Sequence, residues 1–107
     1  MLRKGDVVWL ETPRNPDCRC ADIGAYVAAA REVGGVHVIV DGTFAPPPLQ
    51  RPLALGADVV MHSTTKSLAG HSDAMGGALC ARCPADRVVT SYLPRPPARL
   101  LVLASPS

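Results

Sequence analysis

Three short apolar segments, each followed by polar or turn-forming residues, constrain the fold of this chain more than any other feature. They cover residues 7–11, 36–40 and 58–62 and are rich in valine and isoleucine. Apolar residues follow one another directly in these segments, without the polar alternation of a strand that has one solvated face. Strands that are apolar on both faces are typical of parallel sheets covered by helices. The segments therefore predict an α/β fold.

The residues between these segments predict the connections of such a fold. Asp22 is a good helix N-cap, the apolar residues that follow it recur at helical spacing, and Gly34-Gly35 ends the run. A short helical turn is expected at residues 51–55, and residues 76–81 are typical of a last strand. The order strand, helix, strand, short helix, strand is that of a mostly parallel sheet with crossover helices.

The length of 107 residues leaves room for one compact domain. We expect the α/β domain to occupy residues 1–81. The remaining residues, 82–107, carry four arginines and one acid, a net charge of +3, and are rich in proline. Because proline interrupts helices, this composition predicts a basic, irregular tail, in which Leu100 to Leu103 could form a short strand.

The overall composition excludes several classes of protein. Hydrophobic residues make up 48% of the chain and charged residues 19%, which is too apolar for a disordered chain. The net charge of +2 gives no electrostatic reason to expect a nucleic-acid partner. No apolar stretch reaches the roughly 18 to 20 residues of a membrane helix, and no apolar leader follows Arg3 and Lys4. We therefore expect a cytoplasmic protein that binds neither nucleic acid nor membrane.

The four cysteines form two close pairs, Cys18-x-Cys20 and Cys80-x-x-Cys83. In a cytoplasmic chain a disulfide framework is not expected, and reduced thiols are the simplest interpretation. Two thiol pairs are also the ligand set of a tetrahedral zinc site, although the first pair is more closely spaced than zinc pairs usually are. A small zinc-binding module is therefore one alternative.

Lysine is scarce, because the chain has only Lys4 and Lys66 against nine arginines. Arginine stays protonated at any useful pH, whereas a desolvated lysine can lose its proton and attack a carbonyl. A lysine in the middle of a chain that otherwise uses arginine is therefore either an ordinary surface residue or a nucleophile.

The residues best suited to chemistry follow the ends of the predicted strands. Asn15 follows the first strand, Asp41 ends the second, and Ser63, Thr65 and Lys66 follow the third. Ligands of open α/β sheets bind at the carboxyl ends of the strands. Taken singly, each of these residues is also an ordinary turn, cap or loop residue. Together they offer an amine for a Schiff base, a carboxylate for a pyridine nitrogen and hydroxyls for a phosphate, which pyridoxal 5′-phosphate (PLP) requires.

Four segments of the sequence, in order and with sensible gaps, resemble the Cys/Met-metabolism PLP-dependent enzymes. This family includes cystathionine γ-synthase, the cystathionine β- and γ-lyases and methionine γ-lyase. The resemblance covers about residues 5 to 81, and the four segments together make it specific. They are Val8-Trp9-Leu10-Glu11-Thr12-Pro13-x-Asn15-Pro16, Val40-Asp41-x-Thr43-Phe44-Ala45, Leu49-Gln50-Arg51-Pro52-Leu53-x-Leu55-Gly56-Ala57-Asp58 and His62-Ser63-Thr64-Thr65-Lys66-x-Leu68-x-Gly70-His71-Ser72-Asp73.

The resemblance implies that residues 1–81 form part of the PLP-binding large domain of the aspartate-aminotransferase-like fold (fold type I). It implies β- or γ-elimination or replacement on small sulfur-containing amino acids such as cystathionine. Lys66 would form the Schiff base and move protons, and Asp41 would pair with the pyridinium nitrogen. Asn15 would hydrogen-bond the ring hydroxyl, and Ser63 and Thr65 would hold the phosphate.

The resemblance also implies supporting features. Glu11, Thr43 and Asp73 correspond to structural supports around the site. The family needs no metal, so His62 and His71 are not expected to bind one. Full-length members of the family form homo-oligomers to which each subunit contributes site residues.

Several positions differ from the family pattern. Gly42 stands where the family usually has Asn, Pro46 and Pro48 replace Thr and an often aromatic residue, and Ser67 replaces an aromatic residue. The resemblance further implies an upstream phosphate loop, a ring-stacking Tyr and a C-terminal Arg for the substrate carboxylate, none of which is in these 107 residues. We therefore expect a central fragment of such an enzyme, with an inactive truncated or frameshifted fragment as the alternative. The sequence does not separate synthase from lyase.

Overall fold

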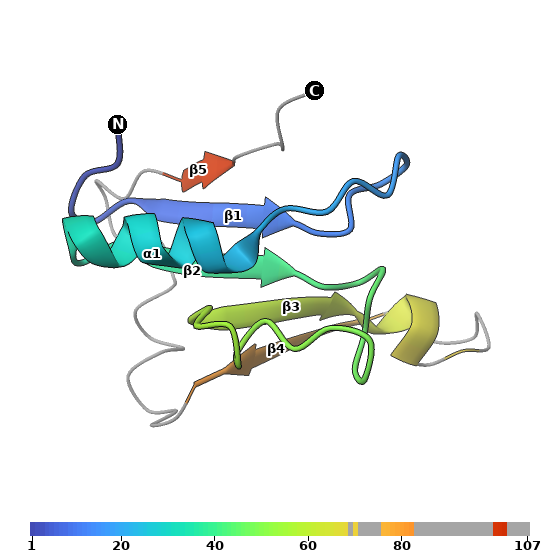
Figure 1. Cartoon of the computed structure of the whole chain (residues 1–107). Coiled ribbons are helices and arrows are strands. Elements are labelled where there is room, and N and C mark those ends of the chain that lie inside the picture. The colour runs from blue at the N-terminus through green and yellow to red at the C-terminus, as the bar shows by residue number, and fades with distance from the viewer. Residues whose placement is uncertain (69, 71–75, 83–99, 103–107) are drawn as a thin grey trace.

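The computed structural model of the chain describes residues 1–68, 70, 76–82 and 100–102. These residues form one five-stranded sheet in the order β4-β3-β2-β1-β5, with helix α1 lying across one face (Figure 1). The helix is α1 (Ile23–Val33), and a short turn η1 (Thr64–Leu68) follows the third strand. The strands are β1 (Val7–Glu11), β2 (His37–Asp41), β3 (Val59–Ser63), β4 (Gly77–Ala81) and β5 (Leu100–Val102).

Most of the sheet is parallel, as the sequence predicts, but the strand predicted at residues 76–81 is antiparallel to its neighbour. β1 pairs in parallel with both β2 and β5, and β2 pairs in parallel with β3. β4 pairs with β3 antiparallel. A parallel pair needs a crossover of a dozen or more residues that returns the chain to the opposite end of the sheet. Here the N–H of Thr64 instead donates to Gly76 O (2.9 Å), so the chain re-enters the sheet at the end where β3 finishes.

Helix α1 has the boundaries that its capping residues predict. The N–H of Ala25 donates to Asp22 Oδ1 (3.0 Å), which is the N-cap hydrogen bond. At the other end Gly34 has a φ of 73°, in the left-handed region that glycine adopts freely, and its N–H donates to Ala30 O. The helix packs against β1 and β2 through one buried cluster. That cluster comprises Val8, Leu10, Ile23, Ala30, Val36, Val38, Val40 and Ala57.

The connection from β2 to β3 contains the short helical turn that the sequence predicts at residues 51–55. The N–H of Leu55 donates to Arg51 O (3.3 Å) and Pro52 O (3.1 Å), but the turn does not propagate. Proline residues precede it without a backbone N–H to donate, and Gly56 leaves it with a φ of 102°. The chain therefore crosses from β2 to β3 as an irregular loop that lies over the sheet.

Asp58 fixes the start of β3 to its neighbours. Its Oδ2 accepts from the N–H of Val38 (2.8 Å), and its own N–H donates to Val38 O (2.9 Å). Its Oδ1 accepts from Arg31 Nη2 at 2.7 Å. One carboxylate thus joins β2, β3 and α1.

Residues 100–102 form a strand in the sheet. Val7 faces Leu100 and Trp9 faces Val102 in the parallel register of β1 and β5. This strand falls where the sequence allows a short strand within an otherwise irregular tail. Residues 83–99 and 103–107 lie outside the described residues, so the predicted boundary at residue 81 stays a prediction. No helix within the described residues is long and apolar enough to cross a membrane.

Candidate active site

The carboxyl ends of β1, β2 and β3 lie level with one another at one edge of the sheet. Glu11 at the end of β1 faces Asp41 at the end of β2, and Asp41 in turn faces Met61 of β3. Ser63 ends β3, and η1 with Lys66 begins at the next residue. The structure therefore places the predicted site residues of these strands at the edge where α/β sheets bind ligands.

Asp41 and Ser63 are joined by a third residue, Thr43. The Thr43 hydroxyl donates to Asp41 Oδ1 (2.6 Å), and the Thr43 N–H donates to the same oxygen (3.0 Å). The hydroxyl oxygen of Thr43 accepts from the N–H of Ser63 (3.0 Å). Both hydrogen bonds to Asp41 end on Oδ1. Within the described residues, Oδ2 has no partner and is left to meet another group.

The loop after β1 is anchored by Thr12. This side chain is fully buried, and its hydroxyl accepts from the N–H of Ala21 (3.0 Å). The backbone N–H of Thr12 donates to Asp41 O (3.2 Å), and its backbone carbonyl accepts from Gln50 Nε2 (2.9 Å). Thr12 thereby fixes the start of this loop to β2, to the β2–β3 connection and to the approach to α1.

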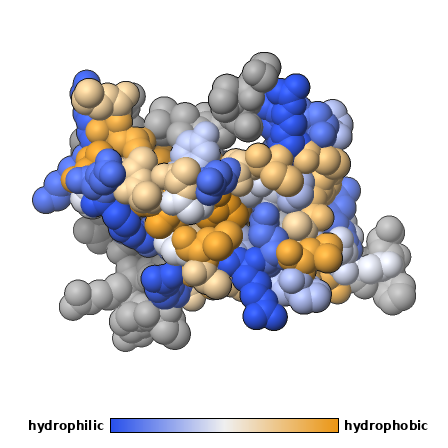
Figure 2. Space-filling view, in the orientation of Figure 1, coloured by the Kyte–Doolittle hydropathy of each residue, from blue (hydrophilic) through white to orange (hydrophobic). Residues whose placement is uncertain are grey.

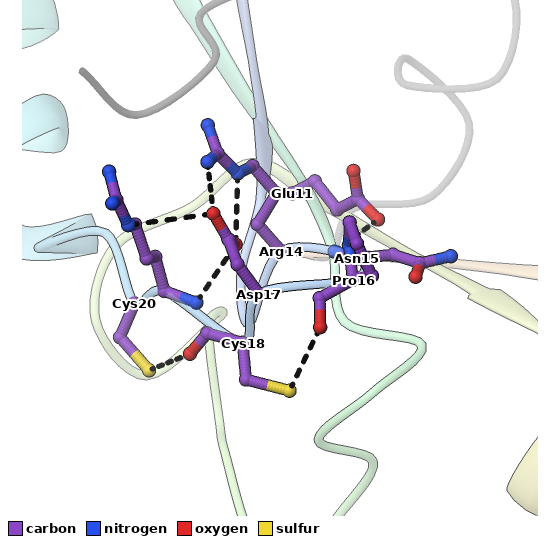
Figure 3. A network of polar contacts seen from close by, with 8 residues as sticks. Glu11, Arg14, Asn15, Pro16, Asp17, Cys18 and Cys20 are labelled. Carbon is purple, nitrogen blue, oxygen red and sulfur yellow. Dashed lines mark hydrogen bonds and ion pairs between the residues drawn. The ribbon is translucent and has the colours of Figure 1, made fainter. Parts of the chain in front are cut away.

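Asn15 lies on the exposed part of this loop (Figure 3). Its N–H donates to Glu11 Oε1 (3.2 Å), while its side-chain amide extends away from the ion pair of Arg14 and Asp17. Arg19 Nε also lies 3.5 Å from Asp17 Oδ2. The hydrogen bonds from Arg14 lower the pKa of Asp17 to about 2. These charges shape the loop and leave the Asn15 amide available to a ligand.

The segment after β3 presents Lys66. The N–H of Gly76 donates to Thr65 Oγ1 (3.3 Å), and the N–H of Gly70 donates to Lys66 O (3.0 Å). Lys66 itself is exposed, and its backbone (φ −86°, ψ −121°) interrupts the helical path of η1. Within the described residues no acid pairs with its amine.

This donor set fits PLP. An exposed amine, a carboxylate with one free oxygen and the hydroxyls of Ser63 and Thr65 lie on consecutive strand ends of one edge. The contacts join Asp41 to Ser63 through Thr43. No contact in the described part of the chain joins either of them to Lys66 or to the side chain of Asn15. The roles assigned to these five residues therefore remain predictions.

The other candidate ligands of the sequence are only partly described. Cys18, Cys20 and Cys80 are free, exposed thiols. Within the described residues, no group of three or more metal-binding side chains occurs. Cys83, which a zinc site would need, lies outside them, as do His71 and Asp73.

Comparison with known proteins decides the family. Residues 1–93 match the profile described as "Cys/Met metabolism PLP-dependent enzyme". The chain belongs to this family.

Individual relatives agree with this assignment. The chain is 56% identical over 73 residues to a probable cystathionine γ-synthase of Herpetosiphon aurantiacus, covering 68% of this chain and 23% of that protein. It is 51% identical over 84 residues to the cystathionine γ-synthase of Escherichia coli, covering 78% and 22%. The crystal structure of an apo methionine γ-lyase from Micromonospora echinospora superimposes with a TM-score of 0.70 at 53% identity, covering 74% and 21%. The chain thus spans about a fifth of the length of these members of the family.

Two positions contribute more to the site than their sequence motifs indicate. Thr43 corresponds to a structural support in the family, but the motif does not reveal its contact with the Ser63 N–H. The sequence indicates only that a strand begins at Gly76. In the structure its carbonyl accepts from the Thr64 N–H, and its N–H donates to the Thr65 hydroxyl oxygen. Both contacts cross between segments that are distant in sequence, so local patterns carry no signal for them.

Proposed function

We propose that this chain is the central cofactor-binding segment of a PLP-dependent enzyme that acts on sulfur-containing amino acids such as cystathionine. The reaction would be elimination or replacement at the β or γ carbon. The relatives named above include cystathionine γ-synthases and a methionine γ-lyase. The resemblance to their family implies this chemistry. The observation that carries the proposal is the Asp41–Thr43–Ser63 connection at the carboxyl edge, next to the segment that bears Lys66.

PLP, when bound, supplies a pyridinium ring that accepts electrons from the substrate's α carbon. Asp41 would keep a proton on the ring nitrogen through its free Oδ2. Thr43 would orient that carboxylate, because it holds the other oxygen with two hydrogen bonds. Lys66 would hold the cofactor covalently and, once the substrate displaces it, take the proton from the α carbon as a general base.

The remaining predicted residues would bind and orient. Ser63 and Thr65 present hydroxyls from the end of β3 and from η1, and hydroxyls are suitable donors to a phosphate. Asn15 presents an unengaged amide from the loop after β1, which suits a ring hydroxyl. Binding on several strand ends would fix the ring relative to the Lys66 amine.

We further propose that the parent enzyme is a cytoplasmic homo-oligomer with a small-molecule amino-acid substrate. The free thiols of Cys18, Cys20 and Cys80 are consistent with a reducing compartment. The small share of each relative that the chain covers supports an active site completed by further segments.

Covalent trapping of PLP tests the proposal on this chain directly. PLP is added, borohydride reduces any lysine linkage to a stable amine, and peptide mass spectrometry locates it. We expect modification at Lys66, and none at that peptide in Lys66→Ala. Lys4→Ala is the matched control, because Lys4 is the only other lysine and is exposed.

The alternative is a catalytically inactive truncated or frameshifted fragment. It predicts no selective reaction, with Lys4, Lys66 and the N-terminal amine labelled at similar low rates. That result, or equal trapping in Lys66→Ala and the wild type, would overturn the assignment of the site.

A further inference from the structure

Two exposed thiols lie in the loop between β1 and α1, which also carries Asn15. The loop projects beyond the end of β1 (Figure 1), and hydrophilic side chains gather at the corner of the molecule where it lies (Figure 2). Cys18 and Cys20 are both free and exposed, with a single residue between them. Redox-sensing cysteines are accessible to solvent and often lie next to a second thiol. This pair meets both conditions.

The two sulfur atoms lie on one short turn. The Cys20 thiol donates to Cys18 O (3.7 Å), and the Cys18 thiol donates to Pro16 O (3.9 Å), as Figure 3 shows. Cα atoms two residues apart lie at most about 7.6 Å from each other, because consecutive Cα atoms are about 3.8 Å apart. Disulfides usually join Cα atoms that are about 4.4 to 6.8 Å apart. The sulfur atoms therefore meet if the backbone bends at Arg19 and the exposed Cys18 side chain rotates away from Pro16.

The backbone of Cys18 is already strained. Its φ of 55° lies in the left-handed region, and it is the one residue other than glycine with a positive φ in the described part of the chain. Residues with a Cβ rarely adopt this conformation, and those that do cluster at functional sites and switch regions. A change of backbone conformation at Cys18 can release this strain, which offsets part of the cost of closing a small disulfide ring.

Backbone hydrogen bonds connect the two cysteines to Asn15 through Arg14. The N–H of Arg14 donates to Arg19 O (2.9 Å), and the N–H of Cys18 donates to Arg14 O (2.7 Å). Arg19 is the residue that a disulfide between Cys18 and Cys20 would enclose, and Asn15 directly follows Arg14. A backbone change at residues 18–20 is therefore transmitted to Asn15.

The ends of the loop are fixed to the rest of the fold. The hydroxyl of Thr12 accepts from the N–H of Ala21 (3.0 Å), which directly follows Cys20. The N–H of Thr12 donates to Asp41 O (3.2 Å), at the end of β2. Because both ends are held, a change inside the loop is not absorbed by movement of β1 or α1. It falls on the residues between, which include Asn15.

We propose that Cys18 and Cys20 are a site of reversible oxidation by hydrogen peroxide, and that this oxidation displaces Asn15. Peroxide oxidises one thiol to a sulfenic acid and is reduced to water. The second thiol then attacks the sulfenic sulfur, which forms the S–S bond and releases a second water molecule. Two molecules of a small cellular thiol reverse the step by exchange and become a disulfide themselves.

The proposed disulfide suits a regulatory role. Strained or exposed disulfides are the labile ones, and the disulfides of cytoplasmic proteins are usually transient and redox-sensing. The oxidation depends only on the two thiols. Its consequence for PLP rests on the proposed function, in which the Asn15 amide binds the ring hydroxyl.

Tryptic digestion after peroxide treatment tests whether the disulfide forms. Trypsin cleaves after Arg19, between the two cysteines, so a bond from Cys18 to Cys20 joins the peptides 15–19 and 20–31. We expect the joined peptides in a non-reduced digest and their separation by dithiothreitol. The intact monomer should lose the mass of two hydrogen atoms, which distinguishes a bond within one chain from a bond between chains.

Cysteine variants are the matched controls. Cys18→Ser and Cys20→Ser each keep one thiol of the pair and should give no joined peptides. A chain with both Cys80→Ser and Cys83→Ser removes the other two thiols and should behave as the wild type does.

Backbone amide NMR tests the coupling to Asn15 without PLP. Oxidation should shift the N–H signals of Arg14 and Asn15, and dithiothreitol should restore them. Val38, in the centre of β2, should not shift. In Cys20→Ser, peroxide should leave the signals of Arg14 and Asn15 much closer to their original positions.

Trapping of PLP at Lys66 with borohydride measures the functional consequence. We expect oxidation to weaken PLP binding about 2- to 10-fold, as loss of one hydrogen bond does. Asn15→Ala should weaken binding in the reduced chain and remove the further effect of oxidation. If the reduced wild type traps no PLP at Lys66, the proposed function fails, whereas the disulfide and the NMR shifts are unaffected.

The proposal is overturned if peroxide converts the two thiols to sulfinic acids without joining the peptides. It is equally overturned if the disulfide forms and the amides of Arg14 and Asn15 do not shift. Equal weakening of PLP binding by oxidation in Asn15→Ala and the wild type would contradict the role of Asn15.

Discussion

At the carboxyl edge of the sheet, the hydroxyl of Thr43 links the carboxylate that ends β2 to the backbone that ends β3. The hydroxyl donates to Asp41 Oδ1 (2.6 Å) and accepts from the Ser63 N–H (3.0 Å). It connects a side chain of β2 to the backbone of β3. The carboxylate is thereby held in one orientation before any ligand arrives. Preorganisation of this kind places a functional group without cost at the moment of binding.

Removing this hydroxyl should therefore destabilise the edge. Thr43→Val keeps the shape of the side chain but leaves the half-buried Ser63 N–H without an acceptor, so we expect a loss of about 1 to 3 kcal/mol in the free energy of unfolding. Thr43→Ser retains the hydroxyl and should lose less. Urea denaturation of both variants measures the difference, and equal losses would show that the hydrogen bonds are not responsible.

The ion pair of Asp17 predicts a dependence of stability on pH. Hydrogen bonds from Arg14 lower the pKa of Asp17 from 3.8 to about 2 in the folded chain. A lowered pKa means that the stabilisation is fully present above the unfolded value and is lost as the pH falls through the folded value. We expect Asp17 to contribute at pH 5 and to lose its contribution between about pH 4 and pH 2.

Asp17→Asn should accordingly reduce the acid-dependent part of the unfolding transition. Urea midpoints at pH 5 and pH 2.5 give the comparison. Glu32→Gln removes another exposed carboxylate, on α1, and serves as the control. A wild-type pH dependence in Asp17→Asn would contradict the prediction.

Among the elements, α1 is positioned by one cap and one shared carboxylate. Asp22 begins the helix, and Arg31 near its end donates to Asp58 Oδ1 at the start of β3. The elements of the sheet differ in how far their sequence determines them. The positions of β1 and α1 follow from local sequence patterns. The direction of β4 does not, because it is set by the hydrogen bond between Thr64 and Gly76, which returns the chain to the end of β3 and makes the pair antiparallel.

Loss of the N-cap should weaken α1. Asp22→Ala removes the acceptor of the Ala25 N–H and should cost about 0.5 to 2 kcal/mol of stability. Asp22→Ser keeps a capping oxygen and should stay close to the wild type. Thermal unfolding followed by circular dichroism distinguishes the two, and similar values for Ala and Ser would show that capping is unimportant here.

On the scale of the whole molecule, β5 is paired with β1 at one edge of the sheet. Strand edges with unpaired N–H and C=O groups promote pairing with other chains. Residues 100–102 therefore protect the side of β1 that β2 does not occupy.

A chain ending at residue 99 should be less stable and should self-associate, because the edge of β1 is uncovered. Sedimentation velocity and urea denaturation measure both effects. A chain ending at residue 102 keeps β5 and is the matched control. If the two truncated chains remain equally monomeric and stable, β5 does not protect this edge.

The sequence alone determines the strands, the helix and the edge at which the candidate residues gather. Strand positions follow from consecutive apolar residues, the helix ends follow from Asp22 and Gly34, and the carboxyl edge follows from the chain order of a parallel sheet. These features depend on neighbours in sequence or on rules of chain topology. They can be read before any contact is known.

Only the tertiary structure decides the strand order, the reversal of β4, the pairing of β5 and the Thr43–Ser63 hydrogen bond. Each of these depends on residues that the fold brings together from distant parts of the chain. Their energies come from packing and hydrogen bonding across strands, for which the sequence around each residue carries no periodic signal.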